Sequence, residues 1–422
     1  MSSSFNPSDR QKEIYTEGAL GHQPKIPVDF KSLELQASKI LSKNAFGYIA
    51  TGAGQEEGIF NNQKAFSSWN IIPSIASGIQ NLDTKRQILG LDLPWPMMYA
   101  PIGVLDLARA KGDLLLVKAS VESQIPMIIS NQASTSMEEV AKALTSQNFW
   151  FQLYFSKSKE LVKSFVQRAE ACGAKAIVLT LDTTTLGWRQ RDLNNAYLPF
   201  IRGLGIAQYT SDPVFKELLK DVNLQTQKSA GNIFQKLRLL HELLKNYPGP
   251  YFGNLKSREP IKAVRKFIEI YSRPELNWDD IQWLKEISNI PVLLKGILHP
   301  NDALQVIKLG IDGIVISNHG GRQIDRVISS LDALVEIKKV VPKDYPLILD
   351  SGIRTGTDIF MALALGAKTV LLGRPYVYAL AINGSKGVLE ITKNILAEFE
   401  ITMKLAGCPN IESITEEKLV RK

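Results

Sequence analysis

The sequence predicts an α/β fold, a closed (β/α)8 barrel of the TIM type, from three observations. Hydrophobic residues make up 45% and charged residues 22% of the 422 positions, which is ordinary for a packed globular protein and excludes a disordered or fibrous chain. Eight short apolar runs of strand length alternate with segments that have the pattern of amphipathic helices. Continuous apolar strands predict a parallel sheet covered on both faces, and closing it into a barrel leaves no free edge.

The predicted strands are spaced as strand–helix units require. They occupy 97–101, 127–130, 150–154, 176–182, 291–296, 313–318, 346–352 and 369–374. Two of the helices between them have recognisable ends. One covers 161–172 and stops at Gly173, which suits a left-handed C-terminal position. The other covers 358–365, with Thr357 as its N-cap and Gly366 after it.

The barrel accounts for most, but not all, of the chain. Residues 1–95 are predicted to form a largely helical extension packed on the barrel, 96–400 the barrel itself, and 401–422 a C-terminal tail. The 115-residue interval after the fourth strand contains a long lid insertion at 195–275. The glycine-rich stretch 52–58 is interpreted as a turn, because its glycine spacing does not fit a dinucleotide-binding loop and no buried strand precedes it.

The positive charge is concentrated in one segment. The chain carries a net charge of +8, of which residues 214–273 contribute +7. No nucleic-acid-binding signature accompanies this segment, so we expect no nucleic-acid partner and interpret it as a solvated, mobile insertion. An anionic partner remains an open alternative.

Composition also constrains location and metal content. With only Cys172 and Cys408, a disulfide scaffold and a cysteine-rich metal site are excluded, and we expect no metal. No apolar run approaches the ~20 residues of a membrane helix. The N-terminus has no signal-peptide pattern and the C-terminus no peroxisomal signal, so a cytoplasmic protein is expected.

Polar side chains gather where the predicted strands end, which is where barrels of this type place their active sites. There are eleven: Ser130, Gln152, Tyr154, Thr180, Asp182, Lys295, Ser317, His319, Asp350, Arg354 and Arg374. One or two could be ordinary loop residues or caps. Eleven on one rim indicate a catalytic site.

The segment Ser-Asn-His-Gly-Gly-Arg-Gln at 317–323 is the most informative. His319 follows a buried strand, and the glycines after it allow close approach of another molecule. A neutral imidazole can accept a proton, and Asp182 could stabilise the imidazolium that results. Arg322 and Arg189 indicate a substrate with a carboxylate, which guanidinium groups bind in bidentate fashion.

A second cluster follows the seventh and eighth strands. Arg354, Arg374 and three glycines, Gly352, Gly356 and Gly373, suit a phosphorylated cofactor, since barrels often bind phosphate there. The alternative is a salt-bridged rim. Lys295 ends an apolar strand, and its burial requires an anion close by.

These motifs together resemble the FMN-dependent α-hydroxy-acid oxidase and dehydrogenase family over nearly the whole chain. The matching segments are 48–53, 100–103, 151–154, 179–182, 294–296, 317–323, 350–356 and 373–375. Within the family the chain is most similar to the lactate 2-monooxygenase branch, with lactate oxidase as a close relative. That similarity is carried by segments 13–15 with Gly18, 186–192, 199–203, 210–215 and 384–387, together with the long fourth loop and Gly103, where simple lactate oxidases typically have alanine.

The resemblance implies roles for individual residues. His319 would be the base, Asp182 its partner and Tyr154 a further catalytic group, while Tyr48, Tyr154, Arg189 and Arg322 would bind substrate. The implied FMN-binding residues are Pro101, Ile102, Gly103, Ser130, Gln152, Thr180, Lys295, Ser317, Asp350, Ser351, Gly352, Arg354, Gly373 and Arg374. Lys295 would stabilise the anionic reduced ring. A homotetramer or homo-octamer is also implied.

The expected activity is oxidation of a small L-2-hydroxy acid, L-lactate above all, with O2, giving acetate, CO2 and water. Two alternatives within the family are an oxidase that releases pyruvate and H2O2, and an acceptor-coupled dehydrogenase. An alternative of another class is a non-catalytic anion-binding barrel whose basic segment docks an anionic surface.

Overall fold

The computed structural model describes residues 5–145, 147–224 and 232–422, and its centre is a closed parallel barrel. The barrel strands are β4 (Met97–Tyr99), β5 (Ile128–Ile129), β6 (Trp150–Leu153), β7 (Ile177–Thr180), β8 (Val292–Lys295), β9 (Gly313–Ile316), β10 (Leu347–Leu349) and β11 (Thr369–Leu372). They pair in the order β4-β11-β10-β9-β8-β7-β6-β5, and a parallel bridge between Tyr99 and Met127 closes the ring. The predicted (β/α)8 fold and its eight strands are confirmed.

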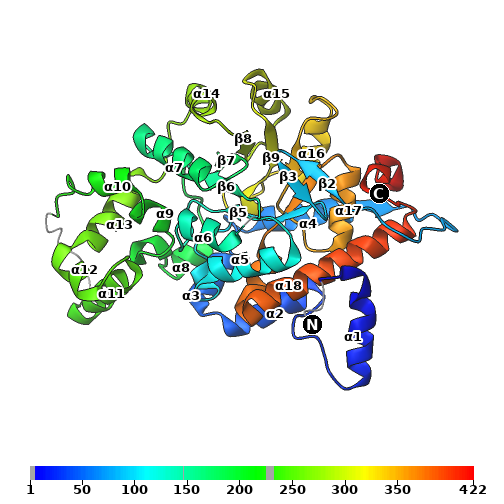
Figure 1. Ribbon diagram of the computed structural model, residues 1–422, viewed down its shortest axis with the longest axis horizontal. Coiled ribbons are helices and arrows are strands. Elements are labelled where there is room, and N and C mark those ends of the chain that lie inside the picture. The colour runs from blue at the N-terminus through cyan, green and yellow to red at the C-terminus, as the bar shows by residue number, and fades with distance from the viewer. Residues whose placement is uncertain (1–4, 146, 225–231) are drawn as a thin grey trace.

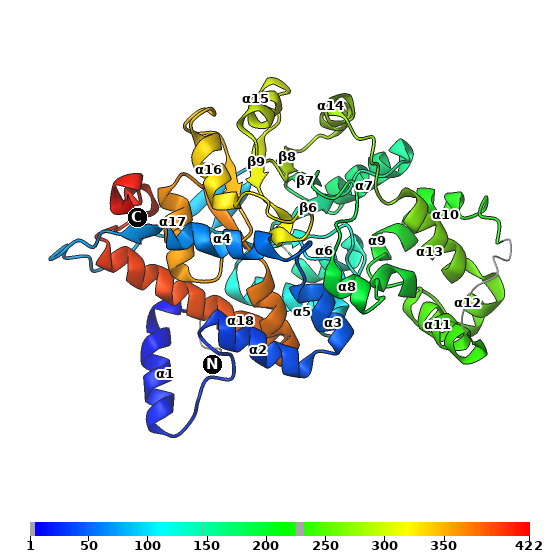
Figure 2. The same cartoon turned by 180° about the vertical axis from the view of Figure 1, so that it is seen from behind.

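Helices surround the barrel (Figures 1 and 2). One follows each strand in turn: α5 (Gly112–Ser123), α6 (Met137–Leu144), α7 (Lys159–Ala171), α14 (Trp278–Ile287), α15 (Pro300–Lys308), α16 (Ser330–Lys338), α17 (Gly356–Ala364) and α18 (Arg374–Leu405). Successive strand side chains point to opposite faces, so Met98, Val178 and Ile348 fill the barrel while their neighbours pack under the helices. This double burial explains the continuous apolar strands.

The predicted ends of two helices are confirmed in part. Gly173 follows α7 with a φ of +85°, as expected. Thr357 as the cap of α17 is wrong: the side chain of Thr355 accepts from the Asp358 backbone N–H, and the Asp358 carboxylate binds back to the N–H of Thr355. The hydroxyl of Thr357 instead bonds Glu398 at 2.9 Å. The reciprocal capping box places the start of the helix earlier.

The N-terminal extension contains helices and also short strands that the sequence did not indicate. Its elements are α1 (Arg10–Ala19), α2 (Phe30–Ile40), α3 (Lys43–Ala50), α4 (Glu57–Ser67), β1 (Trp69–Ile71), β2 (Arg86–Ile88) and β3 (Leu91–Leu93). β2 and β3 form a hairpin whose Ile88, Leu91 and Leu93 join the apolar core inside the barrel. β1 pairs with β12 (Leu419–Arg421) near the C-terminus.

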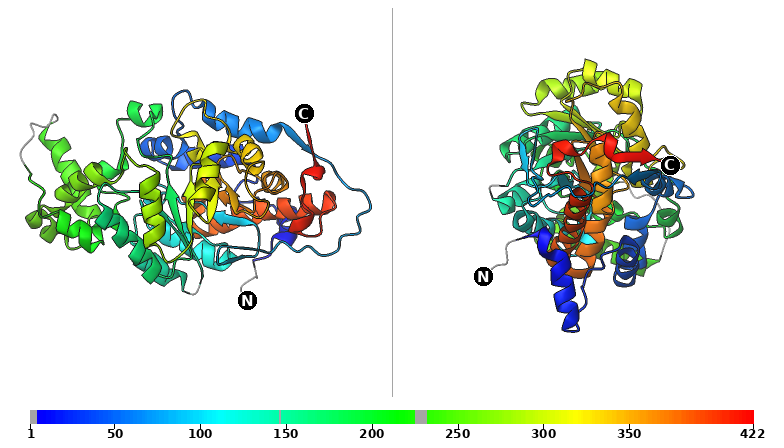
Figure 3. Two further views of the ribbon diagram at one scale, coloured as in Figure 1. Left: turned by 90° about the horizontal axis from the view of Figure 1, so that it is seen from above. Right: turned by 90° about the vertical axis from the view of Figure 1, so that its right-hand side faces the viewer.

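The insertion after β7 is a helical layer at one end of the molecule, the green part of Figures 1 and 3. It contains α8 (Gln190–Asn194), α9 (Ala207–Thr210), α10 (Pro213–Leu218), α11 (Ile233–Asn246), α12 (Tyr251–Ser257) and α13 (Glu259–Ile270). The interpretation as a solvated loop is wrong for its described part, because α13 buries Ala263, Val264 and Phe267. The basic residues cover the outside of a packed layer.

The longest helix, α18, links both ends of the chain to the barrel. It packs against α2, α5 and α17, and it is kinked at Gly384, whose φ is +61°. It runs to Leu405, beyond the expected tail boundary at residue 400. Within the described residues, neither α18 nor any other helix has the length and apolar character needed to cross a bilayer.

Candidate active site

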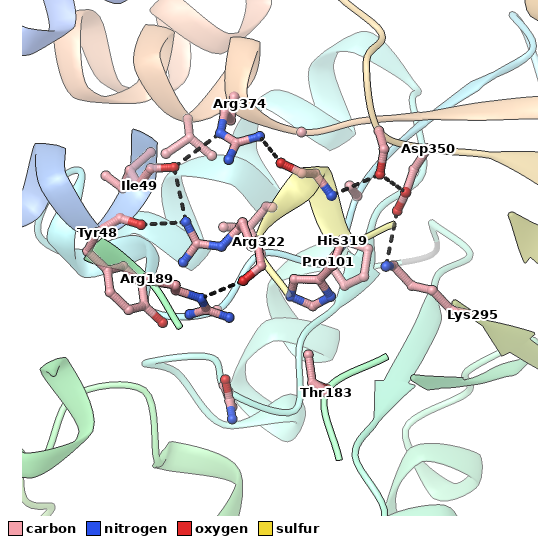
Figure 4. A pocket seen from close by; sticks show the side chains of 18 of the residues that line it. Tyr48, Ile49, Pro101, Thr183, Arg189, Lys295, His319, Arg322, Asp350 and Arg374 are labelled. Carbon is pink, nitrogen blue, oxygen red and sulfur yellow. Dashed lines mark hydrogen bonds and ion pairs between the residues drawn. The ribbon is translucent and has the colours of Figure 1, made fainter. Parts of the chain in front are cut away.

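A cavity of about 320 Å³ opens at the carboxyl ends of the barrel strands, within the usual size range of ligand pockets. Parallel strands bring their C-terminal ends to one rim, so polar residues far apart in sequence meet there. Fifteen of the predicted site residues line it: Tyr48, Pro101, Ile102, Gly103, Tyr154, Arg189, Lys295, His319, Arg322, Asp350, Ser351, Gly352, Arg354, Gly373 and Arg374. Figure 4 shows the polar part of this cavity.

The backbone after β9 aims His319 into the cavity (Figure 4). His319, Gly320 and Gly321 have φ values of +56°, +66° and +75°. Two of these three left-handed residues are glycines, which adopt positive φ without steric strain. A Cβ on Gly321 would lie 2.7 Å from the backbone nitrogen of Ile59. Gly321 is therefore needed to fit the loop after β9 against α4.

His319 has the electrostatics of a base. Burial lowers its pKa below the ordinary 6.5, and Asp182, 2.8 Å from Nδ1, opposes this shift only in part. A neutral ring that donates from Nδ1 to Asp182 leaves the lone pair on Nε2, which has no hydrogen bond among the described residues. Nε2 can thus accept a proton near pH 7.

Lys295 lies beside this pair and is held by two carboxylates. Its Nζ is 3.5 Å from Asp182 and 3.3 Å from Asp350, and it donates to Ser317 at 2.6 Å. Burial lowers the pKa of Lys295, but the two carboxylates outweigh burial and raise it above its usual value. For Asp182 the directions are reversed: burial raises its pKa, but Lys295 and His319 outweigh burial and bring this pKa below its usual value. The anion that the sequence argument required for Lys295 is thus present within the chain.

Four arginines, of which Arg189 is buried and the other three are partly buried, line the cavity without pairing to a carboxylate. Within the described residues, every hydrogen bond that the guanidinium groups of these four arginines donate goes to a backbone carbonyl or to the Gln323 side-chain oxygen; the four are Arg189, Arg322, Arg354 and Arg374. Burial, followed by the neighbouring Arg189, lowers the pKa of Arg322 to about 9, and burial lowers that of Arg354 to about 10. Such a cluster favours binding of anionic groups.

Helix α3 holds two of these arginines. Nη1 of Arg322 donates to the carbonyl of Tyr48 at 2.6 Å, and Nε of Arg374 donates to that of Ile49 at 3.2 Å (Figure 4). Both also bond the Thr51 carbonyl. The C-terminus of a helix carries partial negative charge, which suits bound cations. The extension is therefore one wall of the site.

Tyr48 and Tyr154 both line the cavity. The ring of Tyr48 lies 5.1 Å from the Arg322 guanidinium carbon, within the range of a cation–π contact. Burial, reinforced by Asp182, raises the pKa of Tyr154 to about 12, so this phenol keeps its proton and can donate it in a hydrogen bond.

Five predicted site residues are not among those that line the cavity: Asp182, Ser130, Gln152, Thr180 and Ser317. Ser317 contacts Lys295 and the backbone N–H of His319, and the Ser130 hydroxyl donates to the side-chain Oε1 of Gln152 at 3.1 Å. In the described part of the chain, Gln152 Nε2 and the Thr180 hydroxyl are buried without a partner. Buried polar groups are rarely left unpaired, so these two atoms are suited to hydrogen bonds with a bound ligand.

Sequence reasoning missed the apolar wall contributed by the insertion and by the loop after β7. Its residues are Thr183, Leu186, Leu198, Phe200, Phe267, Ile268 and Tyr271. Phe267 and Tyr271 stack with ring centroids 5.1 Å apart. The amphipathic pattern of 259–270 could have identified a packed helix, but no local pattern shows that this helix reaches the barrel mouth.

Known proteins resemble the chain over nearly all its length. The profile of the FMN-dependent dehydrogenase family matches residues 37–421. An L-lactate oxidase of Lysinibacillus sphaericus is 37% identical over 94% of each chain, and human 2-hydroxyacid oxidase 1 is 34% identical over 92% of this chain and 95% of its own. A lactate oxidase structure from Pediococcus acidilactici (TM-score 0.75, 32% identity) covers 93% of this chain and 94% of its own. The alignment with a mandelate oxidase structure with (S)-4-hydroxymandelic acid has a TM-score of 0.76 and 29% identity, and it covers 94% of this chain and 99% of the mandelate oxidase chain.

The residues present fit FMN. Arg354 and Arg374, after β10 and β11, supply positive charge for a phosphate. The unpaired Nε2 of Gln152 and the Thr180 hydroxyl suit the carbonyl and N–H groups at the edge of a flavin ring. By its sequence and by the chemistry of this site, the chain belongs to the FMN-dependent dehydrogenase family, with FMN as its cofactor.

Proposed function

We propose that this FMN-dependent α-hydroxy-acid oxidoreductase acts on a small L-2-hydroxy acid, L-lactate above all, and converts L-lactate and O2 to acetate, CO2 and water. The observation that carries the proposal is the meeting, in one cavity, of a neutral His319 with Arg189 and Arg322. A base beside two guanidiniums suits a carboxylate whose neighbouring carbon bears a hydroxyl. The similarity to an L-lactate oxidase supports the choice of lactate.

Each residue has a part in this proposal. Arg189 and Arg322 bind the carboxylate, and the phenols of Tyr48 and Tyr154 donate to the carboxylate or hydroxyl. Nε2 of His319 takes the hydroxyl proton if hydride is transferred, or the Cα proton if a carbanion forms. FMN, when bound, accepts the two electrons.

Asp182 and Lys295 set the charge around the reaction. Asp182 stabilises the imidazolium that His319 becomes, through the contact at 2.8 Å. The positive charge of Lys295, beside the cofactor site, favours the electron-rich form of the cofactor.

The products separate the members of this family. Retention of pyruvate beside H2O2 gives acetate, CO2 and water, whereas early release gives pyruvate and H2O2. The insertion favours retention, because Phe267 and Tyr271 close one side of the cavity with apolar surface.

The decisive assay supplies L-lactate and O2 and measures acetate, pyruvate and H2O2. Catalase is included in a parallel reaction, because free H2O2 would decarboxylate released pyruvate in solution. Acetate matching the O2 consumed, with or without catalase, supports the monooxygenase. Pyruvate with stoichiometric H2O2 identifies an oxidase, and turnover with an artificial acceptor but little O2 uptake identifies a dehydrogenase.

Replacing the base tests the site itself. His319→Ala should keep FMN bound yet slow anaerobic bleaching by L-lactate by at least about 100-fold, the lower range for losing a general base. Stopped-flow absorbance measures the rate, and the flavin spectrum checks cofactor content. Bleaching at the wild-type rate would remove His319 from its role.

Gly103 is proposed to influence which products form. A Cβ there would lie 3.0 Å from Cβ of Gln132 and 3.2 Å from its carbonyl, so the cavity wall must shift. Gly103→Ala should therefore lower the acetate fraction and raise pyruvate and H2O2. Gly18→Ala, where a Cβ meets nothing within 4 Å, is the control. An unchanged product ratio would show that Gly103 does not determine it.

The rival of another class, a non-catalytic anion-binding barrel, makes different predictions. It predicts a colourless protein whose binding through residues 214–273 weakens with salt. A flavin spectrum in the purified protein would reject it. The cytoplasmic location stays a prediction. The homotetramer or homo-octamer also stays a prediction, and light scattering of the purified protein measures its mass.

A further inference from the structure

We infer that Gln323 is a positioning residue that fixes the carboxylate-binding arginine and the partner of the base relative to each other. This inference rests on the proposed function, since it concerns how the same site holds a 2-hydroxy acid. The sequence shows Gln323 only as the end of the 317–323 motif. Its contacts lie between the loop after β7 and the loop after β9.

The Gln323 amide is fully engaged by the loop that follows β7. Its Oε1 accepts from Nη2 of Arg189 at 2.6 Å, and its Nε2 donates to the carbonyls of Asp182 and Thr185, each at 2.8 Å. A guanidinium only donates and a carbonyl only accepts, so these partners allow one amide orientation. No acid, hydroxyl or hydrocarbon side chain of this size can make all three bonds.

Arg189 depends on this contact for its position. It is buried, and its Nε donates to the carbonyl of Arg322 at 3.1 Å. Because Nη2 of Arg189 donates to Gln323, Nη1 is the only guanidinium nitrogen of Arg189 with no hydrogen bond within the described residues. Arg189 lines the cavity, so Nη1 is the nitrogen left to bind a substrate. Gly187 permits the close approach, since a Cβ there would lie 2.8 Å from Cα of Gln323.

The second contact reaches the base. Gln323 holds the backbone carbonyl of Asp182, while the carboxylate of Asp182 contacts Nδ1 of His319 at 2.8 Å. One amide therefore connects the group that binds the carboxylate to the group that orients the imidazole. Small displacements of either group are costly to a reaction that depends on alignment.

The test compares Gln323→Leu, which removes all three bonds, with Gln323→Glu, which keeps an acceptor for Arg189 but has no donor for the two carbonyls. Gln87→Leu is the matched control, because its amide contacts Asp92 on the exposed face of the β2–β3 hairpin. We expect both Gln323 variants to retain FMN. Oxalate, a dicarboxylate, is the probe for the carboxylate-binding arginines, and flavin difference spectra measure its binding. Gln323→Leu should weaken oxalate binding at least about tenfold, as expected for a lost charge-assisted hydrogen bond.

Gln323→Glu keeps an acceptor for Arg189 but loses both bonds to the loop carbonyls. Its new carboxylate pairs with Arg189 and opposes a bound anion, so oxalate should bind more weakly, and the displaced Asp182 should slow anaerobic bleaching by L-lactate at least about tenfold. A double-mutant cycle with Arg189→Lys supplies a readout that a general loss of stability would not move. Since Gln323 acts on oxalate through Arg189, the two changes should be clearly less than additive.

Three results would overturn the inference: unchanged oxalate affinity in Gln323→Leu, additivity with Arg189→Lys, or wild-type bleaching in Gln323→Glu. If Gln323→Leu does not fold, Gln323→Glu decides alone through its bleaching rate. Failure of the proposed function looks different, because wild-type protein itself would then neither bleach with L-lactate nor bind oxalate.

Discussion

At the scale of single residues, burial determines how His319 can act. The imidazole is neutral near pH 7 because desolvation disfavours its charged form more than Asp182 favours it. The same burial lowers the pKa of Arg322 to about 9 and that of Arg354 to about 10, so both guanidiniums stay charged at pH 7 and, without a carboxylate partner, prepare the cavity for anions. Burial therefore lowers the pKa of the base and of its anion-binding groups alike, but only the imidazole becomes neutral because its ordinary pKa is close to 7.

This balance predicts the pH dependence. A base works when neutral, and a lowered pKa means that His319 stays neutral until the pH falls below its ordinary 6.5. We therefore expect kcat/KM for L-lactate to be flat around pH 7 and to fall along an acid limb centred below 6.5, measured from pH 4.5 to 8.

Asp182→Asn should move that limb further. Asp182 raises the pKa of His319, so its neutralisation lowers that pKa and shifts the limb to lower pH, while the maximal rate falls because the imidazolium loses its partner. A limb above pH 6.5 in wild type, or one that moves upward in Asp182→Asn, would contradict this account.

At the scale of elements, the insertion is a packed layer whose helix α13 reaches the barrel mouth. Phe267 is fully buried, with its ring centroid 4.8 Å from Tyr209 and 5.2 Å from Phe200. Net charge indicated a solvated segment because the lysines and arginines outnumber acids there. Charge describes the outer face of a helix, however, and the amphipathic inner face decides how it packs.

Phe267→Ala should destabilise the protein by about 3–5 kcal/mol, as expected when a buried aromatic side chain leaves a cavity. Urea unfolding at saturating FMN measures the change. Phe252→Ala in α12 is the control, because that ring is 75% exposed and its loss should cost little. Equal losses in the two variants would show that α13 does not pack as described.

At the scale of the whole molecule, segments far apart in sequence hold the barrel and its site. β1 pairs with β12 near the C-terminus, and Arg10 bonds Glu390 of α18 at 2.8 Å. Asn62 of α4 and Asn318 exchange two hydrogen bonds of 2.9 and 2.7 Å. The amide pair joins the extension to the residue just before His319, so the extension contributes to the site as well as to stability.

Asn62→Ala should lower the melting temperature and slow anaerobic bleaching by L-lactate, because it removes two bonds of the buried Asn318 amide and leaves the Ser330 N–H without a partner. A buried group left unpaired in this way costs about 1–3 kcal/mol. Asn61→Ala removes a single bond to the Val327 carbonyl and is the adjacent control. A larger effect in Asn61→Ala would contradict the proposed link.

The sequence by itself determined the barrel, its eight strands and most of the residues around the cavity. Strand positions follow from local apolar runs, and parallel strands necessarily bring residues such as Asp182, His319 and Arg354 to one rim. Tertiary structure alone decided that Lys295 pairs with Asp182 and Asp350, that α3 holds Arg322 and Arg374, and that Phe267 lines the site. Those contacts join segments up to about 325 residues apart, and no local pattern records which distant surfaces meet when the chain becomes compact.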